Sequence, residues 1–285
     1  MKPAQKARPR SGSEALFMTG RGTNKSIMKC SPWIYTTRLQ KGGALVDDMR
    51  QLVRAWRDAP LQPQRDSGIS GNILNKDTRT RLADVFRRIF LPRFVDGPIP
   101  NAWKLVRPLE DLAVPIHTLR PIYYWITAQA EPMLGDFCRE FILPRQAIVR
   151  AGIGTDEVVS WLEEKRSPWS KTVATKVARG LLAALRDFGI LEGRTQKRLG
   201  GLVLPVPAFA YLAFCLRRNG AVSHSLLAHQ DWQLFLMRPD DVEHFFLLAH
   251  QGRLLEYHAA GSTVSINFPT ESLEEYAHVV AQRSL

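Results

Sequence analysis

The sequence predicts a mainly α-helical protein, in which a helical N-terminal bundle is followed by winged helix-turn-helix-like modules with short β-hairpins. Apolar residues recur at helical spacing in most segments, and glycine and proline cluster between these segments. Two groups of short helices each end in a hairpin-like pattern. We therefore expect a disordered basic tail at 1–32, a helical domain at 33–150, a winged-helix-like module at 151–206 and a second one at 207–285.

The pattern of the N-terminal half predicts a basic tail followed by helices. Residues 1–32 carry seven cationic side chains among proline, glycine and serine, which suits either a phosphate-contacting arm or an artefact of an upstream start site. A helix is expected over 45–56, and another from Asp77, a candidate N-cap, with Pro92 ending or kinking it. Further helices are expected near 101–112, 119–130 and 132–149. Their aromatic residues are interpreted as core rather than as a base-stacking platform: Tyr123, Tyr124, Trp125, Phe137 and Phe141.

The region 151–206 has the order of a winged helix-turn-helix. Thr155 precedes acidic residues and a short apolar pattern, which is typical of a capped helix. Ser167 or Ser170 can cap the next helix, whose apolar stripe extends to Leu185. A charged turn at 192–198 and an extended run at 199–204 then complete the pattern of two helices followed by a hairpin.

Charge favours a nucleic-acid partner for this region. The chain has a net charge of +12, and segment 165–198 holds nine cations against Asp187 and Glu192. Lysine and arginine gain affinity for DNA by displacing the counterions of its phosphates, and a helix fits the major groove. The predicted binding residues for double-stranded DNA are the cations of the turn, the second helix and the wing: Lys165, Arg166, Lys171, Lys176, Arg179, Arg194, Lys197 and Arg198.

Two other functions remain open from the residues. Winged helices also dock proteins, so the chain could be a scaffold for other subunits. A transcriptional repressor would bind tightly at one operator instead. The region 207–285 has a similar order of helices, with a hairpin centred on Gly261, but it is more acidic and better suited to packing, dimerising or binding a partner.

Signatures of enzymes, cofactors and membranes are missing from the sequence. The patterns GxxxxGK[ST], GxGxxG, HExxH and GxSxG do not occur, and the three cysteines contain no CxxC pair. We expect no catalytic residue, no metal and no cofactor. The longest apolar run is too short to span a bilayer, and no signal peptide is recognised, which predicts a cytoplasmic protein without a membrane partner.

Three groups of residues resemble the BrxA family of bacterial phage-exclusion (BREX) systems. They are Tyr35-Thr36-Thr37 with Lys41-Gly42-Gly43, the stretch 231–243, and the segment from Leu255 to Glu275. The resemblance covers 33–280, and the basic tail before it departs from the family pattern. It implies a largely helical, non-enzymatic DNA-binding component of an antiviral locus, acting beside methyltransferase, ATPase and phosphatase-like BREX subunits. The DNA sequence preference and the oligomeric state stay open.

Overall fold

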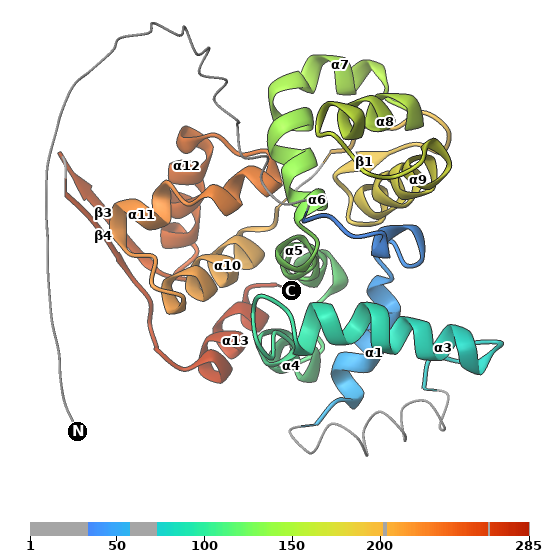
Figure 1. The fold of residues 1–285 in the computed structure, drawn as a ribbon. Coiled ribbons are helices and arrows are strands. Elements are labelled where there is room, and N and C mark those ends of the chain that lie inside the picture. The colour runs from blue at the N-terminus through green and yellow to red at the C-terminus, as the bar shows by residue number, and fades with distance from the viewer. Residues whose placement is uncertain (1–33, 58–72, 202–203, 262, 285) are drawn as a thin grey trace, which may run out of the picture. The chain divides into compact units, whose positions relative to one another are not determined.

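The computed structural model describes residues 34–57, 73–201, 204–261 and 263–284, which belong to one compact unit (Figure 1). The tail predicted at 1–32 and part of the extended run at 199–204 lie outside the described residues. The described part is mainly helical, as predicted, with two small antiparallel sheets. Its N-terminal elements are η1 (Arg38–Gln40), α1 (Val46–Ala55), α3 (Arg79–Val85), η2 (Phe86–Val95), α4 (Trp103–Asp111), α5 (Ile116–Ala130), α6 (Pro132–Asp136), η3 (Phe137–Ile142) and η4 (Leu143–Arg145).

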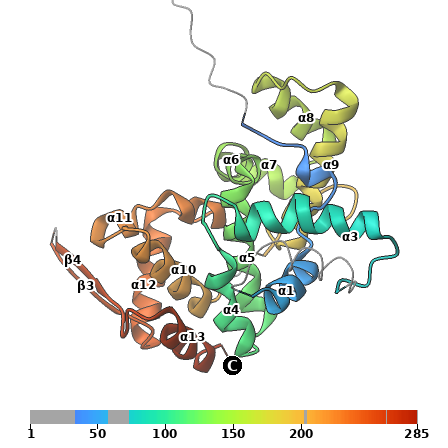
Figure 2. The same ribbon diagram turned by 60° about the horizontal axis from the view of Figure 1, so that its bottom comes forward.

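Helix α5 is the central element of the fold (Figures 1 and 2). It packs against η2, α4, α6 and α10, and its residues are buried on almost every side. A helix that is apolar all round belongs inside a protein, because no face gains by contacting water. The prediction that Tyr123, Tyr124 and Trp125 belong to the core is confirmed by their exposures of 1–2%.

The helix predicted from Asp77 has a different N-cap from the expected one, and it extends past Pro92. Its N-cap is Thr78, whose hydroxyl accepts a hydrogen bond from the Arg81 amide at 3.1 Å. It also does not end at Pro92, because from Phe86 the helix continues as the π-helix η2 as far as Val95. A proline ring clashes with the carbonyl four residues before it in an α-helix, and the wider turns of a π-helix relieve that clash.

The elements from α7 to β2, called the first module here, follow the predicted order. They are α7 (Gln146–Ala151), α8 (Thr155–Glu164), α9 (Lys171–Asp187), β1 (Leu191–Glu192) and β2 (Arg198–Leu199). Strand β1 pairs antiparallel with β2, and Ile153 forms a further bridge with Lys197. The Ser170 hydroxyl caps α9. The cap of α8 is Gly154 rather than Thr155, and the Gly154 amide donates to Glu157 Oε2 at 2.8 Å.

The second module, from α10 to β4, repeats the pattern of helices followed by a hairpin. Its elements are α10 (Val206–Arg218), α11 (Ser223–Leu227), η5 (Gln230–Phe235), α12 (Pro239–Gln251), β3 (Glu256–Ala260) and β4 (Thr263–Asn267). Helix α13 (Leu273–Gln282) follows the module. Strands β3 and β4 pair from Glu256↔Asn267 to Ala260↔Thr263, and Gly261 in the turn has φ 59°. Glycine adopts this left-handed conformation without the steric cost of a side chain. The predicted hairpin centred on Gly261 is therefore present, and it projects outward in both views (Figures 1 and 2).

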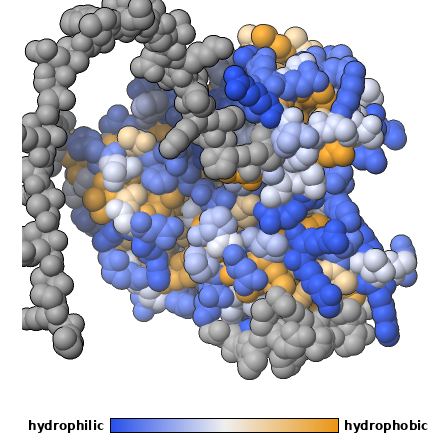
Figure 3. All heavy atoms as spheres, viewed as in Figure 1, coloured by the Kyte–Doolittle hydropathy of each residue, from blue (hydrophilic) through white to orange (hydrophobic). Residues whose placement is uncertain are grey.

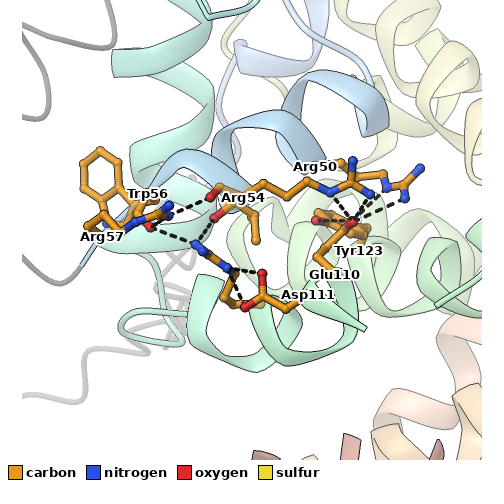
Figure 4. A network of polar contacts seen from close by, with 9 residues as sticks. Arg50, Arg54, Trp56, Arg57, Glu110, Asp111 and Tyr123 are labelled. Atoms are coloured by element: carbon orange, nitrogen blue, oxygen red, sulfur yellow. Dashed lines mark hydrogen bonds and ion pairs between the residues drawn. The ribbon is translucent and has the colours of Figure 1, made fainter. Parts of the chain in front are cut away.

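A buried carboxylate joins α1 to α4 and α5 (Figure 4). Glu110 on α4 accepts hydrogen bonds from Arg50 at 2.7 Å, from Arg54 at 2.8 Å and from the Tyr123 hydroxyl at 3.0 Å. The Glu110 side chain is fully buried, so its charge depends on these donors in place of water. The network fixes the N-terminal helices around α5.

Candidate nucleic-acid interface

The turn between α8 and α9 presents two of the predicted DNA-binding cations. Lys165 is exposed, but its ammonium forms an ion pair with Glu140 and lies 5.7 Å from the centre of the Trp161 ring. Arg166 is also exposed and has a positive φ of 58°, with its amide bound to the Glu163 carbonyl at 2.8 Å. Lys165 therefore has a carboxylate competing for its charge, while Arg166 has no ion pair among the described residues.

Helix α9 is amphipathic, and its cations lie on the solvent side. Val177 and Leu181 are fully buried on one side, whereas Lys171, Lys176 and Arg179 are exposed on the other. No described carboxylate pairs with any of these three cations. Their placement is the one expected from the spacing of the apolar residues.

The β1–β2 hairpin separates its three predicted cations into two groups. Arg194 and Arg198 are exposed and form no ion pair within the described part of the chain. Lys197 differs from the expected wing position, because it is only 5% exposed and its ammonium donates to the Gly193 and Arg194 carbonyls at 2.7 and 2.5 Å. Burial lowers the pKa of Lys197, and the nearby Arg186 charge acts in the same direction. Lys197 therefore closes the turn and does not present its charge to solvent.

The C-terminal half of α9 is covered by the segment 34–43, which contains η1. A Cβ atom at Gly180 would lie only 2.3 Å from the Leu39 carbonyl oxygen, so a larger residue would clash with the backbone of η1. Gly43 lies nearby, against the α9 backbone at Ala184. The exposed cations of α9 without an ion pair among the described residues consequently lie in its first half, from Lys171 to Arg179.

Segment 34–43 is held in place by a buried ion pair. Glu131, which is 2% exposed, accepts from Arg93 Nε at 3.2 Å and from the Thr36 hydroxyl at 3.1 Å. Arg93 also donates to the carbonyls of Gly43 and Gly42 at 2.9 and 3.2 Å. Burial lowers the pKa of Arg93, and the Glu131 charge opposes that shift. The residues that cover α9 are thus tied to the core of the N-terminal helices.

Two further cations of the first module were not among the predicted site residues. Arg186 is exposed on α9, seven residues after Arg179, but it pairs with Asp187 at 2.7 Å. Arg150 is exposed on α7, which packs against β2, and it has no ion pair among the described residues. The helical spacing from Arg179 could have identified Arg186, whereas nothing in the sequence places α7 beside β2.

Neither a large apolar patch on the face drawn in Figure 3 nor a metal cluster or membrane-spanning helix is found among the described residues. Hydrophilic residues predominate on the face seen in Figure 3, and its hydrophobic residues form small separate groups. Within the described residues, no three histidine, cysteine or acidic side chains could jointly hold a metal ion. None of the helices that the structure describes has the length and apolar character needed to cross a membrane.

Comparisons with known proteins identify a family and a related fold. The model of the BrxA family matches residues 33–214, which is more than half of the chain. The chain is also similar to the crystal structure of an uncharacterized protein from Magnetospirillum magneticum, with a TM-score of 0.51 and 16% identity over 70% of this chain and 97% of that one. At that identity the likeness concerns the fold alone. No curated protein matches the sequence.

Proposed function

Because the chain belongs to the BrxA family, and so to BREX anti-phage defence, we propose that it is a non-enzymatic accessory protein that binds duplex DNA. The observation that carries the proposal is the set of exposed cations in the first half of α9 and in the β1–β2 hairpin that form no ion pair with any described residue. The protein would act in the cytoplasm beside other BREX subunits. Its modules supply binding and orientation, and the chemistry belongs to those subunits.

The first module suits a winged helix-turn-helix docked on DNA. In that arrangement the second helix enters the major groove with its N-terminal residues nearest the bases, while the wing contacts the backbone. Lys171 and Lys176 lie on the open half of α9, and segment 34–43 covers the half that would point out of the groove. Arg194 and Arg198 on the hairpin would contact flanking phosphates.

The test is fluorescence anisotropy of a labelled duplex of random sequence, titrated with the full chain across a series of salt concentrations. Binding that weakens steeply with salt is expected, because each phosphate contact releases counterions. Substituting Lys171, Lys176 and Arg179 with glutamine should weaken binding to all sequences. The control is substitution of Arg79, Arg87 and Arg88, three exposed cations of α3 and η2 of which Arg88 pairs with Asp84, and it should leave affinity nearly unchanged. A folded wild-type chain that fails to bind at low salt would refute the proposal.

A protein-docking scaffold is the second candidate, and the second module favours it. Helix α12 is the last helix before the hairpin, as α9 is in the first module, and it exposes Asp240, Asp241 and Glu243 where α9 exposes cations. These carboxylates would repel phosphate, so the second module is suited to contacting another protein. Co-purification of BREX subunits with and without nuclease separates the two functions, because a scaffold keeps its partners after DNA is digested.

A further inference from the structure

A pocket of about 410 Å³ lies in the second module, where α12 ends and the β3–β4 hairpin begins. Its lining residues are His250, Arg253, Leu255, Glu256, Phe268 and Pro269. All six follow residue 214, so the pocket lies outside the part of the chain that the BrxA model matches. Its volume falls within the range of small-molecule sites in proteins.

The apolar side of the pocket is built on a fixed aromatic ring. Phe268 is 9% exposed, and its ring meets those of Phe214 and Tyr276 edge-on, with centroids 5.3 and 5.4 Å away. The Arg217 guanidinium lies 5.5 Å from the centre of the Phe268 ring. Because its neighbours hold the ring, the small exposed part of Phe268 forms a fixed apolar wall that a ligand can contact without Phe268 losing side-chain freedom on binding.

The polar side of the pocket offers a cation, a carboxylate and an imidazole donor. Arg253 and Glu256 are exposed, and neither forms an ion pair with another described residue. The His250 Nδ1 atom accepts a hydrogen bond from the Tyr257 amide at 3.3 Å. In the neutral ring this leaves the proton on Nε2, which is then a hydrogen-bond donor.

We propose that this pocket binds a nucleoside monophosphate group. Arg253 and His250 Nε2 would bind the phosphate, since an arginine guanidinium matches phosphate geometry. Glu256 would accept hydrogen bonds from the ribose hydroxyls or from an exocyclic amino group, and the base would lie against Phe268 and Pro269. The same chemistry is presented by a free nucleotide and by the 5′-phosphorylated end of a nucleic-acid strand. The pocket is separate from the first module and does not depend on duplex binding there.

The test is isothermal titration of the full chain with AMP and with adenosine. AMP should bind more tightly than adenosine, and Arg253→Gln should weaken AMP binding by about tenfold or more while leaving adenosine unaffected. Arg283→Gln, which neutralises another exposed cation that forms no ion pair with a described residue, should change neither titration. No saturable binding of AMP by the folded chain, or equal losses in both variants, would overturn the proposal.

A second pair of titrations identifies the source of the phosphate. A short single strand is compared with and without a 5′-phosphate, in the wild type and in Arg253→Gln. A preference for the phosphorylated strand that disappears in the variant assigns the pocket to strand ends. A pocket for free nucleotides gives AMP binding that depends on Arg253 and no such preference. A preference that persists in Arg253→Gln contradicts the assignment of Arg253 to the phosphate.

Discussion

Replacing both Arg194 and Arg198 with glutamine removes two exposed cations from the hairpin, whereas replacing Lys197 with glutamine removes a buried one. Under the proposed function, Arg194 and Arg198 contact phosphate. The Lys197 ammonium is already bound to two carbonyls of the turn. In a binding assay, replacing Arg194 and Arg198 is therefore expected to weaken DNA binding, whereas replacing their neighbour Lys197 is not.

The size of the effect follows from the number of phosphate contacts. Each contact contributes about 0.9 to the slope of log affinity against log salt, so losing two should reduce the slope by about 1.8. Between 50 and 200 mM salt, the fold-loss of affinity of the double variant should therefore be about twelvefold smaller than that of the wild type. Lys197→Gln should leave the slope unchanged but reduce stability by about 1–3 kcal/mol, because two carbonyls lose a charged donor.

Anisotropy titrations at four or more salt concentrations give the slope, and thermal denaturation followed by circular dichroism gives the stability. A slope that does not change when Arg194 and Arg198 are neutralised would exclude the hairpin from the interface. A reduced slope for a fully folded Lys197→Gln chain would contradict the role assigned to Lys197. Neither result depends on knowing a preferred DNA sequence, since phosphate contacts are independent of sequence.

Three further predictions concern the fold itself. Glu110→Gln should lower stability by about 1–3 kcal/mol, because it removes the charge of the buried carboxylate that Arg50 and Arg54 bind from its partly exposed side. The more exposed Asp111→Asn should cost under about 1 kcal/mol; urea denaturation measures both, and equal losses would contradict the buried network. Gly180→Ala should destabilise by about 1–3 kcal/mol and lower the melting temperature, because the new methyl group meets the Leu39 carbonyl; a gain in stability would contradict this packing. In a Cys30→Ser chain, the two remaining cysteines, Cys138 and Cys215, are buried, and burial raises their pKa values to about 12. A thiol reagent at pH 8 should therefore react with them only after unfolding. Rapid labelling of the native chain would refute that burial.

The sequence pattern located α8 and α9 of the first module and α10, α11 and α12 of the second, but not α7 or η5, nor the groups that hold the helices together. The periodicity from Val173 to Leu185 predicted α9 and its exposed cations, because one helix face must exclude water. The ion pair between Arg93 and Glu131 joins residues 38 positions apart, and no local pattern identifies such a pair. Lys197 was misplaced for a related reason: a charged residue in a short turn is normally exposed, and its burial depends on carbonyls that only the folded turn brings together.

The residues that carry the family resemblance near the N-terminus have structural roles in this fold. Thr36 and the carbonyls of Gly42 and Gly43 bind the buried pair of Arg93 and Glu131. A side chain at Gly42 would collide with Ile89, since its Cβ would lie 1.9 Å from the Ile89 Cδ1 atom. The motif therefore keeps segment 34–43 close to the core and, through η1, against α9. If α9 enters the groove of DNA, this motif sets how far α9 is exposed, which connects the family pattern to the proposed binding function.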